Sequence, residues 1–233
     1  MTENNIKMEN IPESMQLNMG DPYQPNIDKM YTYVRGYCVG ANLSQSLRAL
    51  QFAREAHKEQ KRKNGLPYIV HPLSMACFAI ALELRDDDVL STILLHDVPE
   101  DCGIPVESLP VNDAVKRAVK YMTVTPFPTD KDKIETKHRY FTELLESKEA
   151  IICKAIDRYV NLSDAPFGLT KDAIGKNCAE TTVLLLPILK QAKEKYAELA
   201  NLLYVLRTIL MNTNRILMNT CPTEYEHWYQ KYN

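Results

Sequence analysis

The chain has 233 residues, of which 45% are hydrophobic and 25% are charged, and its formal net charge is −2. A chain of this length and composition can bury a sizeable core, so we expect one globular domain with extensions. The nearly balanced charge argues against a nucleic-acid or membrane-surface binder, because neither surface would attract the chain electrostatically. We therefore expect no nucleic-acid partner and no membrane partner.

The sequence also favours a cytoplasmic location. Residues 1–26 are polar and lack the apolar run of a signal peptide. No stretch approaches the roughly 20 apolar residues needed to span a bilayer. The six cysteines are scattered without a Cys-x-x-Cys pair, so we interpret them as reduced thiols that mostly pack in the interior.

The first elements are predicted from apolar spacing and helix-start signals. Residues 1–40 are expected to form a loosely ordered extension. Apolar residues recur at helical spacing from Ser44 to about Glu59, which predicts a helix capped by a serine. His71-Pro72 opens the next helix, because proline is tolerated in a first turn, and this helix is expected to end near Leu84. The acidic run Asp86–Asp88 starts another helix.

The later elements are also helical. Pro99 would remove a backbone hydrogen bond from a continuing helix, so we expect the chain to bend near Asp97 and to place Glu100 and Asp101 on a tight turn. Further helices are expected at 112–122, 133–145, 150–162 and, interrupted by Pro187, at about 173–211, with a loop at 123–132. The aromatic tail CPTEYEHWYQKYN is expected to pack on the surface or on a partner. The predicted fold class is all-α.

Two histidines and two aspartates point to a metal site. His71, His96, Asp97 and Asp157 lie in the segments YIVHP, LLHDVPED and KAIDRYVNL, and imidazole and carboxylate together suit a divalent transition metal. Asp157 stands in a largely apolar helix, where a lone carboxylate is costly unless it is paired or binds a metal. The competing interpretation is that Asp157 pairs with Arg158 or caps a neighbouring helix. Asn161, one turn later, shares the face of Asp157.

The three segments together resemble the hydrolase domain of Rel/SpoT-type alarmone enzymes, a branch of the HD superfamily of metal-dependent phosphohydrolases. The resemblance covers roughly Ser44 to Asp164. It is carried by EQKRKNGLPYIVHP, which is similar to the basic loop and first ligand motif of the family, by LLHDVPED, and by KAIDRYVNLSD. It implies an HD-domain helical bundle. We therefore expect residues 41–205 to form the HD domain, between the N-terminal extension at 1–40, which is assigned from composition, and a helical, aromatic tail at 206–233.

The resemblance also implies roles for individual residues. His71, His96, Asp97 and Asp157 match the metal ligands, which hold one divalent cation, with manganese (Mn2+) expected. Glu100 and Asp101 match the acidic pair that positions or activates the attacking water. The residues that match the nucleotide pocket are Arg62, Lys63, Asn64 and Asn161. Three positions depart from the family pattern: Pro99 replaces an apolar β-branched residue, Asn64 a common serine, and Ser163 a common arginine.

The function expected from this pattern is manganese-dependent hydrolysis of the 3′-pyrophosphate of a guanine nucleotide alarmone, ppGpp or pppGpp, to GDP or GTP. The chemistry of the residues agrees, because a metal that leaves coordination positions open can bind a water and a phosphate oxygen together. The segments show no nucleophilic serine or cysteine constellation. Two alternatives stay open: an HD phosphohydrolase acting on another nucleotide, such as a nucleoside phosphate or NADPH, and a non-catalytic module that senses a nucleotide.

Overall fold

The computed structural model describes residues 25–62, 65–124 and 133–233, and this part of the chain is all-α, as the sequence predicts. The first half contains α1 (Ile27–Gly40), α2 (Ser44–Ala56), α3 (Val70–Ala81), α4 (Asp87–Leu95), α5 (Val98–Cys102) and α6 (Asp113–Met122). The second half contains α7 (Lys133–Glu143), α8 (Lys148–Asp164), α9 (Lys171–Glu180), α10 (Leu186–Lys195), α11 (Ala200–Met218) and α12 (Pro222–Tyr232). The described residues form no β-strand and only one isolated bridge, between Lys61 and Pro67.

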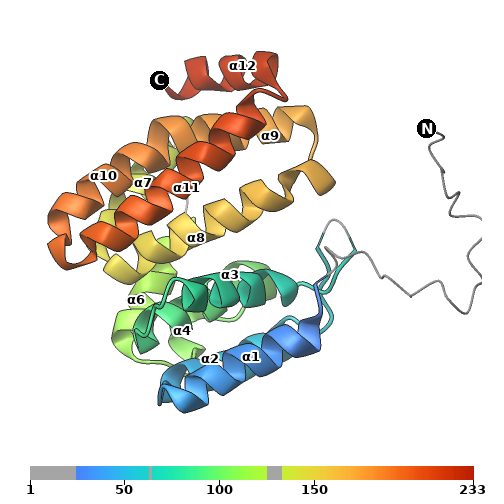
Figure 1. The fold of residues 1–233 in the computed structure, drawn as a ribbon, viewed down its shortest axis with the longest axis vertical. Coiled ribbons are helices and arrows are strands. Elements are labelled where there is room, and N and C mark those ends of the chain that lie inside the picture. The colour runs from blue at the N-terminus through green and yellow to red at the C-terminus, as the bar shows by residue number, and fades with distance from the viewer. Residues whose placement is uncertain (1–24, 63–64, 125–132) are drawn as a thin grey trace, which may run out of the picture.

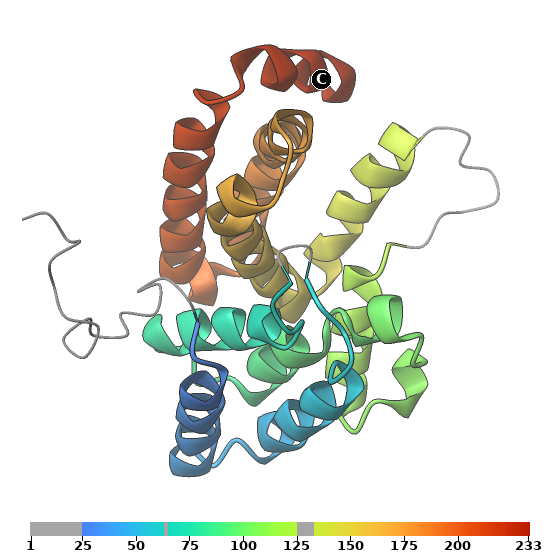
Figure 2. The ribbon, with the colours of Figure 1, turned by 90° about the vertical axis from the view of Figure 1, so that its right-hand side faces the viewer.

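Helix α8 lies between two groups of helices (Figures 1 and 2). It packs against α3, α4 and α6 on one side and against α10 and α11 on the other. Residues on all sides of its first half are completely buried, including Ile151, Ile152 and Ile156. A helix that is apolar all round is expected in a protein interior, and this position carries Asp157 into the centre of the molecule.

Part of the predicted N-terminal extension is helical. Residues 27–40 form α1, which Asn26 caps by accepting a hydrogen bond from the backbone N–H of Lys29. Val34 and Cys38 of α1 are buried, so this part of the expected extension belongs to the folded core. Residues 1–24 lie outside the described residues. The division into an HD domain at 41–205 and a tail at 206–233 stays a prediction.

The predicted serine cap of α2 is wrong. Ser44 is the first helical residue, and Leu43 at the cap position makes no side-chain capping bond. The N–H groups of Gln45 and Ser46, which have no acceptor within the first turn of the helix, instead donate to the carboxylate of Asp87, at 3.0 and 2.7 Å. A carboxylate from the neighbouring helix α4 therefore replaces a local cap, and it also ties α2 to α4.

The chain bends at His96 and Asp97, as expected from Pro99. Helix α4 ends at Leu95 and the one-turn helix α5 begins at Val98. Pro99 lies in the first turn of α5, where its missing N–H would have no helical partner. Glu100 and Asp101 therefore lie on a short helix and not on the tight turn that the sequence predicted.

The predicted helix at 173–211 is divided in two places. Before Pro187, residues 181–185 form a π-helical turn between α9 and α10, consistent with the carbonyl of Val183 lacking the N–H donor that Pro187 would otherwise supply. The larger break lies at Tyr196, after which α11 turns back to pack on α10. The prediction missed this break because residues 188–204, which surround Tyr196, contain neither proline nor glycine.

The aromatic tail forms α12, which packs on α9 (Figure 1). Gly175 of α9 permits the contact, because a Cβ atom there would lie 2.7 Å from the backbone carbon of Glu224. We expect Gly175→Ala to destabilise the protein by about 1–3 kcal/mol, the usual cost of overpacking, in urea unfolding followed by circular dichroism. Gly40→Ala is the control, since a Cβ at Gly40 meets no atom within 4 Å; equal stability of the two variants would contradict the prediction.

The cysteines fit the interpretation that they are thiols that mostly pack in the interior. All six cysteines are free, and Cys38, Cys153, Cys178 and Cys221 are buried. Among the described helices, none combines the length and the apolar character that crossing a membrane requires.

Candidate active site

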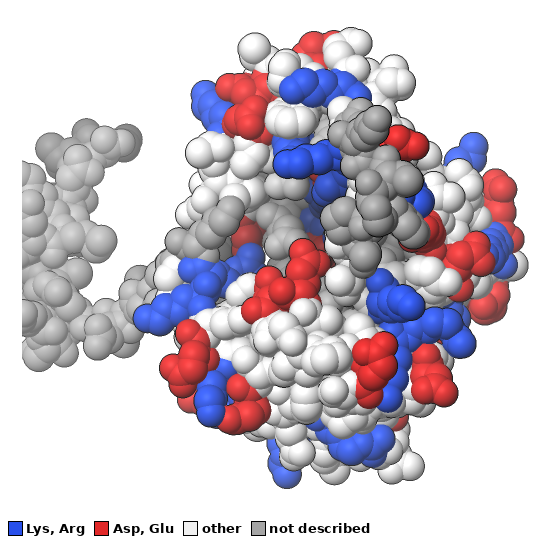
Figure 3. Space-filling model, turned by 180° about the vertical axis from the view of Figure 1, so that it is seen from behind, with Lys and Arg blue, Asp and Glu red and all other residues white. Residues whose placement is uncertain are grey.

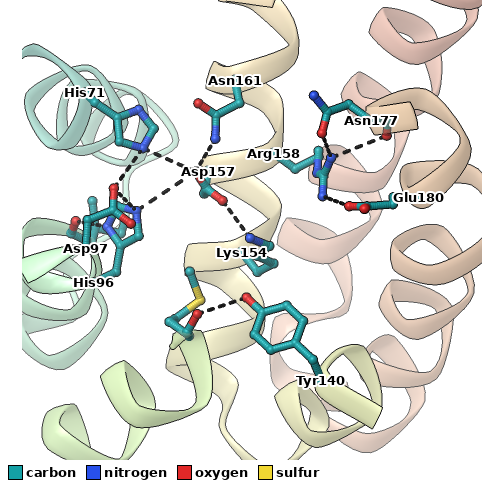
Figure 4. A network of polar contacts seen from close by, with 12 residues as sticks. His71, His96, Asp97, Tyr140, Lys154, Asp157, Arg158, Asn161, Asn177 and Glu180 are labelled. Carbon is teal, nitrogen blue, oxygen red and sulfur yellow. Dashed lines mark hydrogen bonds and ion pairs between the residues drawn. The ribbon is translucent and has the colours of Figure 1, made fainter. Parts of the chain in front are cut away.

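Three separate parts of the fold bring the predicted metal ligands together. His71 lies in the first turn of α3, and His96 and Asp97 occupy the bend between α4 and α5. Asp157 lies in the buried middle of α8. Figure 4 shows the side chains from α3 and from the bend pointing toward Asp157.

The donor atoms lie within reach of one small cation. The His71 Nε2 atom is 3.2 Å from Asp157 Oδ1 and 3.6 Å from Asp97 Oδ2. The His96 Nε2 atom is 3.1 Å from Asp97 Oδ2 and 3.9 Å from Asp157 Oδ1. Ligands at about 2.0–2.2 Å from one ion are roughly 3–4 Å from one another, so these spacings fit a shared metal. His71, His96 and Asp97 alone form a possible metal-binding group.

The hydrogen bonding of His96 also fits a metal ligand. Its Nδ1 atom donates to the carbonyl of Ile93 at 2.9 Å, which leaves the lone pair of Nε2 directed into the cluster. Nε2 is buried and makes no hydrogen bond within the described part of the chain. A lone pair facing carboxylates is unfavourable unless a cation lies between them. Burial lowers the pKa of His96, but Asp97 and Asp157 outweigh it and raise this pKa to about 9, because the two carboxylates favour a positive charge at Nε2, either a proton or a metal cation.

Neighbouring side chains orient the two carboxylates. Tyr68 donates its hydroxyl hydrogen to Asp97 Oδ2 at 2.7 Å. Asn161 donates to Asp157 Oδ1 at 2.5 Å, and Lys154 donates to Asp157 Oδ2 at 2.9 Å. Burial would raise the pKa of Asp157, but Lys154 and His71 hold it well below its usual value. Asp157 is therefore a carboxylate fixed in orientation by its neighbours.

The structure excludes the competing interpretation of Asp157. Arg158 points away from Asp157 and donates to Glu180 Oε2 at 3.0 Å and to Asn177 Oδ1 at 2.8 Å (Figure 4). Asp157 lies in the middle of α8 and caps no helix. Its contacts are instead Lys154, Asn161 and the two histidines.

The cluster opens on a cavity of about 610 Å³, and Figure 3 shows a hollow on one face where acidic and basic side chains meet. A volume of this size suits a small-molecule ligand. The residues that line it include Arg62, Tyr68, His71, His96, Asp97, Glu100, Asp101, Lys137, Lys154, Asp157, Arg158, Asn161, Lys176, Asn177 and Glu180. Acidic metal-ligand candidates and basic side chains therefore share one cavity, as binding a metal and an anion together would require.

The predicted acidic pair lies at this cavity. Glu100 and Asp101 are both exposed and both line it. Partial burial, Asp97 and Asp101 raise the pKa of Glu100 above its usual value. A carboxylate with a raised pKa is a stronger base, so Glu100 is suited to accept a proton.

Only some of the residues predicted to bind the nucleotide can be located at the cavity. Arg62 and Asn161 line the cavity, and Arg62 forms an ion pair with Asp164 at 3.1 Å. Lys63 and Asn64 lie outside the described residues, as does most of the loop at 123–132.

Several cavity residues were not predicted from the sequence. Tyr68 lies before the start of α3 at Val70, so helical spacing does not relate it to His71. Lys154 precedes Asp157 by three residues in α8, a spacing that places both residues on the same helical face. That spacing could have identified Lys154. The group formed by Lys137, Arg158 and Glu180 joins three helices, and no local pattern connects these positions.

Comparisons with known proteins show what parts of the chain are similar to. Residues 49–121 match the sequence profile of the HD domain. The chain is 36% identical over 118 residues to a guanosine-3′,5′-bis(diphosphate) 3′-pyrophosphohydrolase of Aquifex aeolicus, covering 49% of this chain and 17% of that protein. It is 30% identical over 179 residues to a GTP pyrophosphokinase of Streptomyces coelicolor, covering 72% of this chain and 20% of that protein.

The chain spans about a fifth of the length of these curated relatives. A solved structure described as "A metazoan ortholog of SpoT hydrolyzes ppGpp and plays a role in starvation responses" aligns with a TM-score of 0.46 and 21% identity, over 80% of this chain and 94% of that one. Residues 49–121 are thus similar to the HD domain, and parts of the chain are similar to proteins named as guanosine-3′,5′-bis(diphosphate) 3′-pyrophosphohydrolases.

Proposed function

We propose that this protein hydrolyses the 3′-pyrophosphate of guanosine alarmones such as ppGpp and pppGpp, leaving GDP or GTP and releasing pyrophosphate. The observation that carries the proposal is the His71–His96–Asp97–Asp157 cluster on the wall of a cavity that also holds basic side chains. Homology to proteins named as 3′-pyrophosphohydrolases supports the choice of substrate.

The relatives include proteins named for synthesis as well as for hydrolysis. The geometry favours hydrolysis, because that reaction needs an activated water and an acceptor for its proton. The cluster provides nitrogen and oxygen donors for a cation, and Glu100 lines the same cavity. We therefore assign the hydrolytic reaction to the segment that the chain shares with these proteins.

We expect His71, His96, Asp97 and Asp157 to hold one divalent cation, with manganese as the metal. A mixed set of imidazole and carboxylate donors suits such an ion. When bound, the cation would polarise a water molecule and offset negative charge on the phosphate. The protein keeps both histidine Nε2 atoms directed at the two carboxylates, and Tyr68, Asn161 and Lys154 hold those carboxylates in place.

The remaining roles follow from position and charge. Glu100 is the proposed acceptor of the water proton, and Asp101 the residue that helps to orient the water. Arg62, Lys63, Asn64 and Asn161 are the proposed contacts to the nucleotide. Lys154 is a partly buried cation beside Asp157, and we propose that it also contacts the phosphate, since phosphoryl transfer depends chiefly on positioning and charge neutralisation.

The direct test is incubation of the purified full chain with manganese and ppGpp, followed by separation of the nucleotides and detection of pyrophosphate. We expect equal amounts of GDP and pyrophosphate. A panel with nucleoside phosphates and NADPH separates this activity from that of a related phosphohydrolase. Release of orthophosphate, or turnover of another nucleotide without turnover of ppGpp, would contradict the proposal.

Glu100→Gln is expected to lower kcat by about 10²–10⁴-fold, the contribution of a general base, while metal content by mass spectrometry stays unchanged. Glu107→Gln is the matched control, because Glu107 is exposed, does not line the cavity and lies in the next short helix (Val106–Ser108). Equal, low turnover in the native chain and in Glu100→Gln would instead favour the nucleotide-sensing alternative.

A further inference from the structure

Helix α12 reaches from the outer surface of α9 to the wall of the cavity. Its start packs on Gly175, and Trp228 Nε1 donates to Asp172 Oδ1 at 2.8 Å. The Lys176 ammonium lies 4.9 Å from the centre of the Trp228 ring. These contacts fix the helix along α9, so that its last residue, Tyr232, reaches the end of α9 at Glu180.

Tyr232 is buried and bound at two points. Its side chain is almost completely enclosed, with 3% of the residue exposed. Its hydroxyl donates to Glu180 Oε1 at 2.7 Å, and its backbone oxygen lies 3.1 Å from His138 Nε2 of α7. Burial and Glu180 raise the pKa of Tyr232, so the hydroxyl keeps its proton and acts as a donor.

Glu180 connects Tyr232 to two cations of the cavity wall. Glu180 Oε1 lies 3.1 Å from Lys137 Nζ, and Glu180 Oε2 lies 3.0 Å from Arg158 Nη2. Lys137, Arg158 and Glu180 all line the same cavity as Asp157. Two cations face one carboxylate, which leaves one excess positive charge for an anionic ligand.

We infer that Tyr232 is a positioning residue, which acts through Glu180 to hold Lys137 and Arg158 where they contact an anionic group of the substrate. The identity of that group as a phosphate rests on the proposed function.

The hydroxyl is expected to matter because it shares Glu180 Oε1 with Lys137. A carboxylate oxygen that accepts two donors is held between them. Without the hydroxyl, Glu180 can turn toward its two cations and bind them more closely. Lys137 and Arg158 would then be less available to a ligand. The packing of α12 would be kept, because the aromatic ring at position 232 would still fill the same buried space.

Tyr232→Phe removes only the hydroxyl, and Tyr225→Phe is the matched control. Tyr225 is on the same helix, and its hydroxyl donates to Thr182 Oγ1 at 3.3 Å, away from the cation pair. We expect Tyr232→Phe to raise the KM for ppGpp about fivefold, in keeping with loss of a hydrogen bond to a charged group, with kcat within about twofold. We expect Tyr225→Phe to leave both constants unchanged, and thermal melts to show that both variants fold.

A second measurement does not depend on turnover. Metal-free full-length protein is titrated with inorganic pyrophosphate in a calorimeter, and we expect Tyr232→Phe to bind it about fivefold more weakly than the native chain. Unchanged KM and unchanged pyrophosphate affinity would overturn the inference, as would equal effects of the two substitutions or no binding to the native chain. If the native chain does not cleave ppGpp, the proposed function fails, and the titration still decides the role of Tyr232.

Discussion

Asp157→Asn is expected to lower the rate of ppGpp hydrolysis by roughly 10³-fold, the scale seen when a charge-stabilising group is lost from a phosphoryl-transfer site. Asp157 contributes a carboxylate oxygen 3.2 Å from His71 Nε2 and 3.9 Å from His96 Nε2. An asparagine keeps the shape but has no charge to attract the cation. Metal content measured by mass spectrometry should therefore fall together with kcat.

Two further variants make this result interpretable. Asp113→Asn is the control, because Asp113 is exposed in the first turn of α6 and does not line the cavity; it should keep native activity and metal content. Asp157→Asn also leaves the partly buried Lys154 ammonium without its carboxylate, which can destabilise the fold. His71→Gln removes a metal ligand while Lys154 stays paired, so it should cause a similar loss. Native turnover in either cluster variant would contradict the metal site.

The parts of the fold that the sequence predicted are those with strong local signals. Apolar spacing and acidic first turns identified α4, α6 and α8 to within a few residues. The candidate site residues were proposed partly from the resemblance to Rel/SpoT-type hydrolases and partly from a local signal at Asp157. Asp157 is an acidic residue in an apolar helix. A buried carboxylate of this kind needs a counter-charge or a metal ion, so its position pointed to the other polar residues as partners.

The parts that were missed depend on contacts between distant segments. Adjacent residues on a helix point about 100° apart, so Arg158 could not share the environment of Asp157, and its partner Glu180 lies 22 positions later on another helix. The cap of α2 comes from Asp87, which lies more than 40 positions away. No local pattern contains this information, because it arises only when the helices pack.

The largest stability effect is expected at Glu180. Glu180 is 2% exposed and pairs with Arg158 and Lys137. Glu180→Ala would leave two cations facing each other inside the protein, and breaking a buried pair in this way typically costs about 3–5 kcal/mol. Urea unfolding at pH 7 measures the loss. An unfolding free energy equal to that of the native chain would show that the network contributes nothing to stability.

The pH dependence gives an independent test of the same network. Burial would raise the pKa of Glu180, but Arg158 and Lys137 outweigh it and lower this pKa to about 2, well below the usual value of a glutamate. A carboxylate with a lowered pKa stabilises the folded state above its unfolded pKa, and this stabilisation is lost as the pH falls through the folded value. As the pH falls from about 5 to about 2, the native chain should therefore lose the contribution of the Glu180 carboxylate to its unfolding free energy. Glu180→Gln cannot titrate and lacks this contribution at every pH.

The difference in unfolding free energy between the native chain and Glu180→Gln should accordingly be largest at pH 7 and should shrink toward pH 3. Glu226→Gln is the control, because Glu226 is exposed and its carboxylate accepts a hydrogen bond from Gln230 on the same helix; it should differ from the native chain by no more than about 0.5 kcal/mol at either pH. A difference for Glu180→Gln that stays constant with pH would mean that the carboxylate is not stabilised by its cations. Interactions other than the ion pairs with Glu180 would then have to hold Lys137 and Arg158 in the cavity wall.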